Sequence, residues 1–132
     1  MVKTASTQVL RTGQKSPHFR LKGIDDKMHS LDDFNSKSVL VVFICNHCPY
    51  VIARIGDIIN LQSTFKPSEL QVIGVNSNDP DYEGEGFENM VRFARQYKIN
   101  YPYLIFHGCS LLAQHASCPA TFTCRQLIQT TP

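Results

Sequence analysis

Residues 39–50 run VLVVFICNHCPY. The first six are apolar, mostly β-branched and without alternation, which predicts a central strand buried on both faces. Cys45 and Cys48 follow this strand directly and are separated by two residues. Apolar residues then recur at helical spacing as far as about Phe65. The segment therefore predicts a strand, a Cys-x-x-Cys pair and a helix in direct succession.

A Cys-x-x-Cys pair at such a junction predicts redox chemistry. A helix N-terminus carries unpaired N–H groups and a partial positive charge, and both favour a thiolate, the species that attacks disulfides. With both sulfurs on the first helical turn, Cys45 and Cys48 could also close a disulfide with each other. Two inert buried cysteines are the alternative. The position after a central strand favours the catalytic interpretation.

Segments on either side of this core predict the rest of an α/β fold. The pattern indicates a hairpin from 19–22 and 27–29, a short helical turn from Ser30 to Phe34, strands at 70–75 and 101–106, and a helix over 87–97, after a flexible loop at 83–86. Strands that alternate with helices pair in parallel, with helices on the faces of the sheet. We therefore expect an α/β sandwich with a central mixed sheet and an N-terminal β-hairpin.

Length and charge narrow the class of protein. The chain has 132 residues, a formal net charge of +2 and a charged fraction of 18%. This length predicts one folded domain. The sequence contains no cluster of basic residues, no apolar run long enough to cross a bilayer and no hydrophobic region of a secretory signal. We expect no nucleic-acid or membrane partner and a cytoplasmic location.

Several segments together resemble a known family: residues 17–19, 43–51, 75–79 and 101–104, with Met90. They resemble the redoxin branch of the thioredoxin superfamily, and more narrowly the peroxiredoxin-like proteins related to alkyl hydroperoxide reductase and thiol-specific antioxidant. The resemblance covers roughly residues 14–106. It divides the chain into a flexible N-terminus (1–15), a thioredoxin-like redoxin domain (16–107) and an atypical tail (108–132).

The resemblance implies thiol-disulfide exchange or antioxidant activity in cell redox homeostasis. It implies that Cys45 attacks and Cys48 resolves, that no cofactor is needed, and that the partners are a protein or small-molecule disulfide substrate and a dithiol reductant. A peroxiredoxin carries a threonine three residues before its peroxide-reacting cysteine. Counted back from Cys48, that position is Cys45 itself. Dithiol exchange is therefore favoured over direct peroxide reduction.

Other side chains are predicted to line the same site. Asn46, His47, Pro49 and Tyr50 adjoin the cysteines, and Asn76 and Asn78 follow the neighbouring strand at the same edge of the sheet. His47 either adds positive charge that makes the pair more oxidising or faces solvent without effect. Tyr50 either shields the disulfide or packs, and the two asparagines either line the site or form a turn. Pro119 is a candidate for the cis proline that faces the cysteines in this family, or a residue of an irregular tail.

The end of the chain departs from the family. Three of the five cysteines, Cys109, Cys118 and Cys124, lie after residue 107, and no acidic residue follows Glu88. We expect an altered or truncated C-terminus that leaves the fold incomplete. Two other functions stay open: a non-catalytic truncated redoxin, and a zinc or copper(I) protein in which Cys45 and Cys48 bind metal together with His47, His107, Cys109 or Cys118. The lack of a second Cys-x-x-Cys argues against structural zinc.

Overall fold

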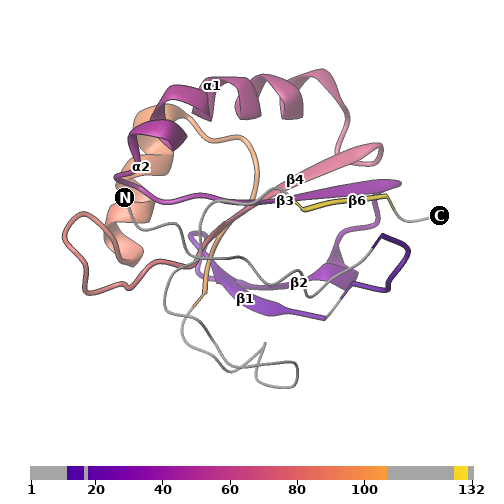
Figure 1. Ribbon diagram of the computed structural model, residues 1–132, viewed down its shortest axis with the longest axis horizontal. Helices are drawn as coiled ribbons and strands as arrows, with labels where there is room; N and C mark the ends of the chain where they lie inside the picture. Colours follow the sequence, from indigo (N-terminus) through magenta and orange to yellow (C-terminus); the bar gives the residue numbers. More distant parts are fainter. Residues whose placement is uncertain (1–11, 17, 107–126, 131–132) are drawn as a thin grey trace.

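The computed structural model describes residues 12–16, 18–106 and, as backbone only, 127–130. Within this part of the chain, six strands form one mixed sheet in the order β2-β1-β5-β4-β3-β6 (Figure 1). The central strands β3 (Ser38–Phe43), β4 (Leu70–Asn76) and β5 (Tyr103–Ile105) are parallel. Strand β1 (Arg20–Gly23) pairs antiparallel with β5 and with β2 (Met28–Ser30). The predicted mixed sheet with an N-terminal hairpin is confirmed.

Two helices cover one face of this sheet. Helix α1 (Pro49–Thr64) extends along that face in Figure 1, and α2 (Phe87–Tyr97) packs into the same core. The shared core joins Leu40, Val42 and Val72 of the sheet to Val51 and Ile55 of α1 and to Met90 and Phe93 of α2. Alternate strand residues point to opposite faces, so both helices meet the same set of side chains.

The opposite face of the sheet has its own apolar cluster. Val39, Ile73, Val75 and Leu104 are buried there with Leu21 of the hairpin. The partly buried side chains that pack on them include Phe19 and two residues near the 3-10 turn η1 (Leu31–Asp33), namely Leu31 and Phe34. Burial on both faces accounts for the unbroken apolar run of β3. The sequence pattern predicts helices on the faces of the sheet, and in the described residues both helices cover the same face.

The third predicted strand is shorter than expected, with three residues instead of six. Tyr101 and Pro102 precede it, and Pro102 has no N–H to donate to a neighbouring strand. Its carbonyl still accepts the N–H of Gly74 at 2.8 Å. The strand therefore begins after the proline, at Tyr103.

Strand β6 (Leu127–Thr130) pairs antiparallel with β3 at the far edge of the sheet. The sequence pattern does not predict a strand here, within the segment named as an atypical tail. The cis proline candidate Pro119 lies outside the described residues, and the bounds of the three segments stay predictions. Among the residues with described structure, neither helix combines the length and the apolar character that crossing a bilayer requires.

Candidate active site

The two cysteines lie between the carboxyl end of β3 and the start of α1. Pro49 occupies the first position of the helix, where its fixed φ fits and its missing N–H costs nothing. Cys48 is therefore the N-cap, and its carbonyl accepts the first helical hydrogen bond, from Ile52 at 3.0 Å. Cys45 lies three residues before this cap. The prediction that both sulfurs sit on the first helical turn is wrong, because the proline starts the helix after them.

The structure also corrects the predicted ionisation of Cys45. Its burial raises the pKa of the thiol to about 11, and the charges of Cys48 and Glu85 act in the same direction. Backbone N–H groups of Cys48 and His47 oppose this change by hydrogen bonding to the sulfur. A thiolate gains from those two donors, but it loses more from desolvation and from nearby negative charge. At neutral pH, Cys45 is a thiol.

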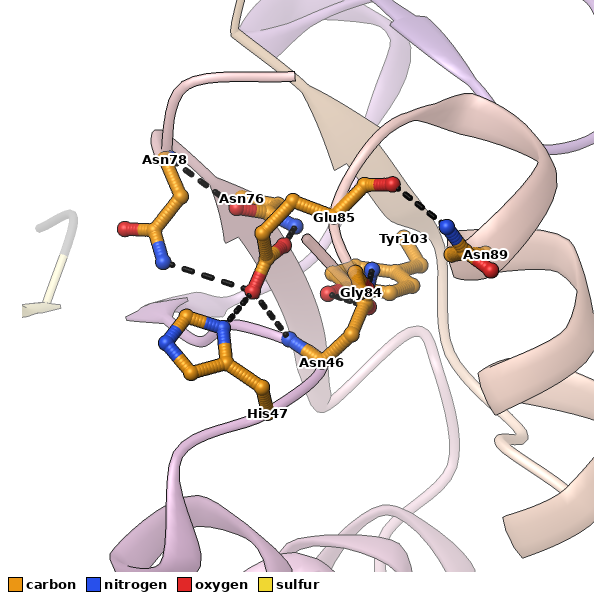
Figure 2. Close-up of polar contacts among 8 residues, drawn as sticks. All are labelled: Asn46, His47, Asn76, Asn78, Gly84, Glu85, Asn89 and Tyr103. Atoms are coloured by element: carbon orange, nitrogen blue, oxygen red, sulfur yellow. Dashed lines mark hydrogen bonds and ion pairs between the residues drawn. The ribbon is translucent and has the colours of Figure 1, made fainter. Parts of the chain in front are cut away.

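The negative charge near Cys45 belongs to a buried carboxylate, that of Glu85, whose side chain is 0% exposed. One backbone N–H and three side chains bind this carboxylate, as Figure 2 shows. The N–H of Asn46 donates at 3.1 Å, the amide of Asn76 at 2.6 Å and the amide of Asn78 at 3.4 Å. The ring nitrogen Nδ1 of His47 is the fourth partner. We call these four residues the Glu85 cradle.

The loop between β4 and α2 carries Glu85 into this position. Its backbone N–H donates to the carbonyl of Tyr82 at 2.9 Å, and its carbonyl accepts the amide of Asn89 at 2.7 Å. The flanking Gly84 and Gly86 have φ values of 84° and 88°, which favour glycine and let the chain turn inward. Within the loop predicted to be flexible, Glu85 is thus buried and has the hydrogen-bond partners that a buried carboxylate requires.

His47 pairs with Glu85 and packs against Tyr82, with ring centroids 4.9 Å apart and the ring planes tilted by 31°. Its side chain is 42% exposed. Both predicted alternatives for His47 are therefore incomplete. The ring does reach solvent, but any positive charge on it faces a carboxylate and does not act on the thiols alone.

The other predicted site residues divide into two groups. Asn76 and Asn78 both form a turn and line the site. The N–H of Asn78 donates to Asn76 Oδ1 at 3.0 Å, and the side-chain amides of both residues bind Glu85. Asn46 belongs to the cradle and also accepts a hydrogen bond from the hydroxyl of Tyr103 at 2.9 Å. By contrast, Tyr50 is 74% exposed, so it does not pack in the core.

Sequence reasoning missed two residues of this site, Glu85 and Tyr103. Tyr103 is fully buried, and burial together with the Glu85 charge raises the pKa of its phenol, which keeps the hydroxyl a donor to Asn46. Neither residue has a local motif. The only available signal was a charged side chain in the loop after a strand that ends at the site.

The arrangement allows two kinds of chemistry. Cys45 and Cys48 are close enough to influence each other's ionisation, as a dithiol that cycles with a disulfide must be. In addition, Sγ of Cys45, a ring nitrogen of His47 and a carboxylate oxygen of Glu85 lie within 4.8 Å of one another. Thiolate, imidazole and carboxylate are all zinc ligands in proteins.

A mixed sheet with an N-terminal hairpin, and a cysteine pair between its central strand and a helix, define a redoxin of the thioredoxin superfamily. The chain matches the AhpC/TSA family over residues 12–113 and belongs to that family. This confirms the resemblance found in the sequence.

Individual relatives agree with this class. Thiol-disulfide oxidoreductase ResA of Halalkalibacterium halodurans is 22% identical over 90% of this chain and 64% of its own length. A hypothetical protein of Sinorhizobium meliloti 1021 has a similar structure, with a TM-score of 0.74 and 24% identity over 82% of this chain and 60% of its own. The thioredoxin domain of a thiol-disulfide oxidoreductase from Bacteroides vulgatus gives a TM-score of 0.62 and 20% identity, over 74% and 66%. The chain thus spans less than two thirds of each of these proteins.

Proposed function

We propose that this chain is a thiol-disulfide oxidoreductase whose redox pair is Cys45 and Cys48. The observation that carries the proposal is the place of the two cysteines, both free and partly buried, between β3 and the N-terminus of α1. Membership in the AhpC/TSA family and the name of the ResA relative support it.

The proposed reaction has two exchange steps. The thiolate of Cys45 attacks one sulfur of a substrate disulfide, forms a mixed disulfide and releases the other substrate sulfur as a thiol. The thiolate of Cys48 then attacks the Cys45 sulfur, which releases the second substrate thiol and leaves a Cys45–Cys48 disulfide. A dithiol reductant returns the pair to the reduced state. We assign the attack to Cys45 because two backbone N–H groups point at its sulfur and stabilise the thiolate once it forms.

The finer parts of the proposal are the partners and the biological role. We propose a protein or small-molecule disulfide as substrate and a dithiol as reductant, acting in redox homeostasis in the cytoplasm. An antioxidant role that reduces peroxide directly is less favoured, since Cys45 stands where peroxiredoxins have threonine. The remaining positions of the predicted site, including Pro49 at the start of α1, would contact the substrate around the cysteines.

An insulin reduction assay with dithiothreitol tests the activity. We expect the unmodified 132-residue chain to accelerate the reduction, and both Cys45→Ser and Cys48→Ser to lose the acceleration. Cys48→Ser should also accumulate a mixed disulfide with a model substrate, visible by mass spectrometry, because its attacking thiol remains. Rates equal to background for the unmodified chain would support the non-catalytic alternative. A mixed disulfide that accumulates only on Cys45→Ser would reverse the two roles.

A further inference from the structure

The cluster of Cys45, His47 and Glu85 can do more than disulfide exchange. The three side chains come from the β3–α1 junction and from the β4–α2 loop, and they bring together a sulfur, a nitrogen and an oxygen within 4.8 Å. The buried carboxylate beside the sulfur and the imidazole completes a mixed set of ligand types.

The Glu85 carboxylate lies close to the Cys45 sulfur, so it repels the thiolate that disulfide exchange requires. The carboxylate is also held firmly, since the Glu85 cradle supplies donors to both of its oxygens. A divalent cation would reverse this conflict, because it would attract both the thiolate and the carboxylate.

The distances suit a small tetrahedral cation. Zinc bonds of about 2.0 Å to nitrogen or oxygen and 2.3 Å to sulfur place ligand atoms roughly 3.3–3.7 Å apart. The three ligand atoms are within 4.8 Å of one another. The Cys45 sulfur would therefore need to approach the other two atoms by at most about 1.5 Å, which rotations of the partly exposed His47 and of the Cys45 side chain can supply. His47 and Glu85, which are already in contact, would move apart around the ion. A mixed set of sulfur, nitrogen and oxygen ligands favours zinc over magnesium or calcium.

We propose that the reduced protein binds one zinc ion through Cys45 Sγ, a ring nitrogen of His47 and a carboxylate oxygen of Glu85, with water in the fourth position. Binding releases the thiol proton of Cys45 to solvent, and the contact between His47 and Glu85 opens to admit the ion. Cys48 is not among the three ligands. The set also differs from the sequence-based metal hypothesis, whose other candidates, His107, Cys109 and Cys118, lie outside the described residues.

Zinc binding and disulfide formation exclude each other, because Cys45 cannot be a thiolate ligand while it is bonded to Cys48. The ion would thus protect the reduced site. This last step rests on the proposed function, but zinc binding by the three ligands does not.

Calorimetric titration of the reduced 132-residue chain with zinc sulfate tests the proposal. We expect one ion per chain, with affinity about 10-fold or more weaker in Glu85→Gln, since even outer partners of a metal site change affinity by that much. Glu83→Gln is the matched control, because Glu83 is an exposed acid in the same loop, and it should bind like the unmodified chain. His47→Asn, changed at a partly exposed residue, gives a second test if Glu85→Gln fails to fold by circular dichroism.

Two further experiments distinguish this zinc site from the proposed disulfide exchange and from a metal site in the tail. Cys48→Ser keeps all three ligands and cannot form the Cys45–Cys48 disulfide, so it should retain zinc binding whatever the insulin assay shows. Cobalt(II) in place of zinc should give a thiolate charge-transfer band that disappears in Cys45→Ser. No binding by the reduced chain, or equal affinity in folded Glu85→Gln and His47→Asn, would overturn the proposal. Loss of zinc in Cys109→Ser or Cys118→Ser with full binding in Glu85→Gln would move the site to the tail.

Discussion

Replacing Glu85 by alanine should destabilise the protein by about 3–5 kcal/mol. The substitution removes the acceptor for four donors at a side chain that is 0% exposed. A hydrogen bond to a charged group contributes about 1.5–3 kcal/mol. His47 can turn to water and the Asn78 contact is long, at 3.4 Å. The estimate therefore counts only the Asn46 and Asn76 donors, which are left without a partner in the protein interior.

Urea unfolding followed by circular dichroism measures this effect at constant pH and in the presence of a chelator. Glu83→Ala is the control, since this exposed neighbour should change stability by no more than about 0.5 kcal/mol. If Glu85→Ala does not fold, Asn78→Ala removes one weak donor and should cost about 1 kcal/mol or less. A loss below about 1 kcal/mol in Glu85→Ala would show that water reaches the Glu85 cradle, and the electrostatic account of the site would fail with it.

Three further predictions concern ionisation and backbone conformation. Burial, the largest cause, and the Glu85 charge both raise the pKa of Cys45 without any contribution from Cys48. Alkylation of Cys45 by iodoacetamide in Cys48→Ser, followed by peptide mass spectrometry, should therefore still accelerate above about pH 9, where an ordinary thiol levels off. Gly86→Ala should lower stability by about 1–3 kcal/mol, because φ is 88° and the new Cβ would lie 2.9 Å from the carbonyl oxygen of Pro80. Gly56→Ala should raise stability by about 0.5–1 kcal/mol, since this α1 glycine has open space around it; thermal unfolding compares the two, and equal effects would contradict both.

Much of the fold could be predicted because its signals are local. The apolar run of β3, the cysteine pair and the helical spacing after it are continuous in the sequence, and the structure places β3 and α1 within a residue or two of the predicted bounds. The hairpin and α2 agree equally well. Strand β6 was missed because its extended conformation depends on pairing with β3, which is about ninety residues earlier in the chain.

The site was predictable where its residues adjoin the motif, or where, like Asn76 and Asn78, they follow the neighbouring strand at the same edge of the sheet. Cys45, Cys48, Asn46 and His47 are neighbours in the sequence, whereas Glu85 is 39 residues from Asn46. Glycines beside Glu85 indicated flexibility, and an acid in a glycine-rich loop usually faces solvent. Here the same glycines allow the positive φ angles that turn the loop inward. Composition alone cannot separate these two outcomes, because they differ only in long-range contacts.

The chemistry of the cysteines therefore depends on the β4–α2 loop as much as on the motif. The motif alone leaves two roles for His47, an imidazole that makes the pair more oxidising or one that faces solvent without effect. In the folded protein, the Glu85 carboxylate lies against that ring and, after burial, also raises the pKa of Cys45. A less ionised thiol stabilises the reduced form less through its charge, so the pair should be a weaker oxidant than the motif predicts. The oxidising strength of the cysteine pair then depends on Glu85, a residue outside the motif.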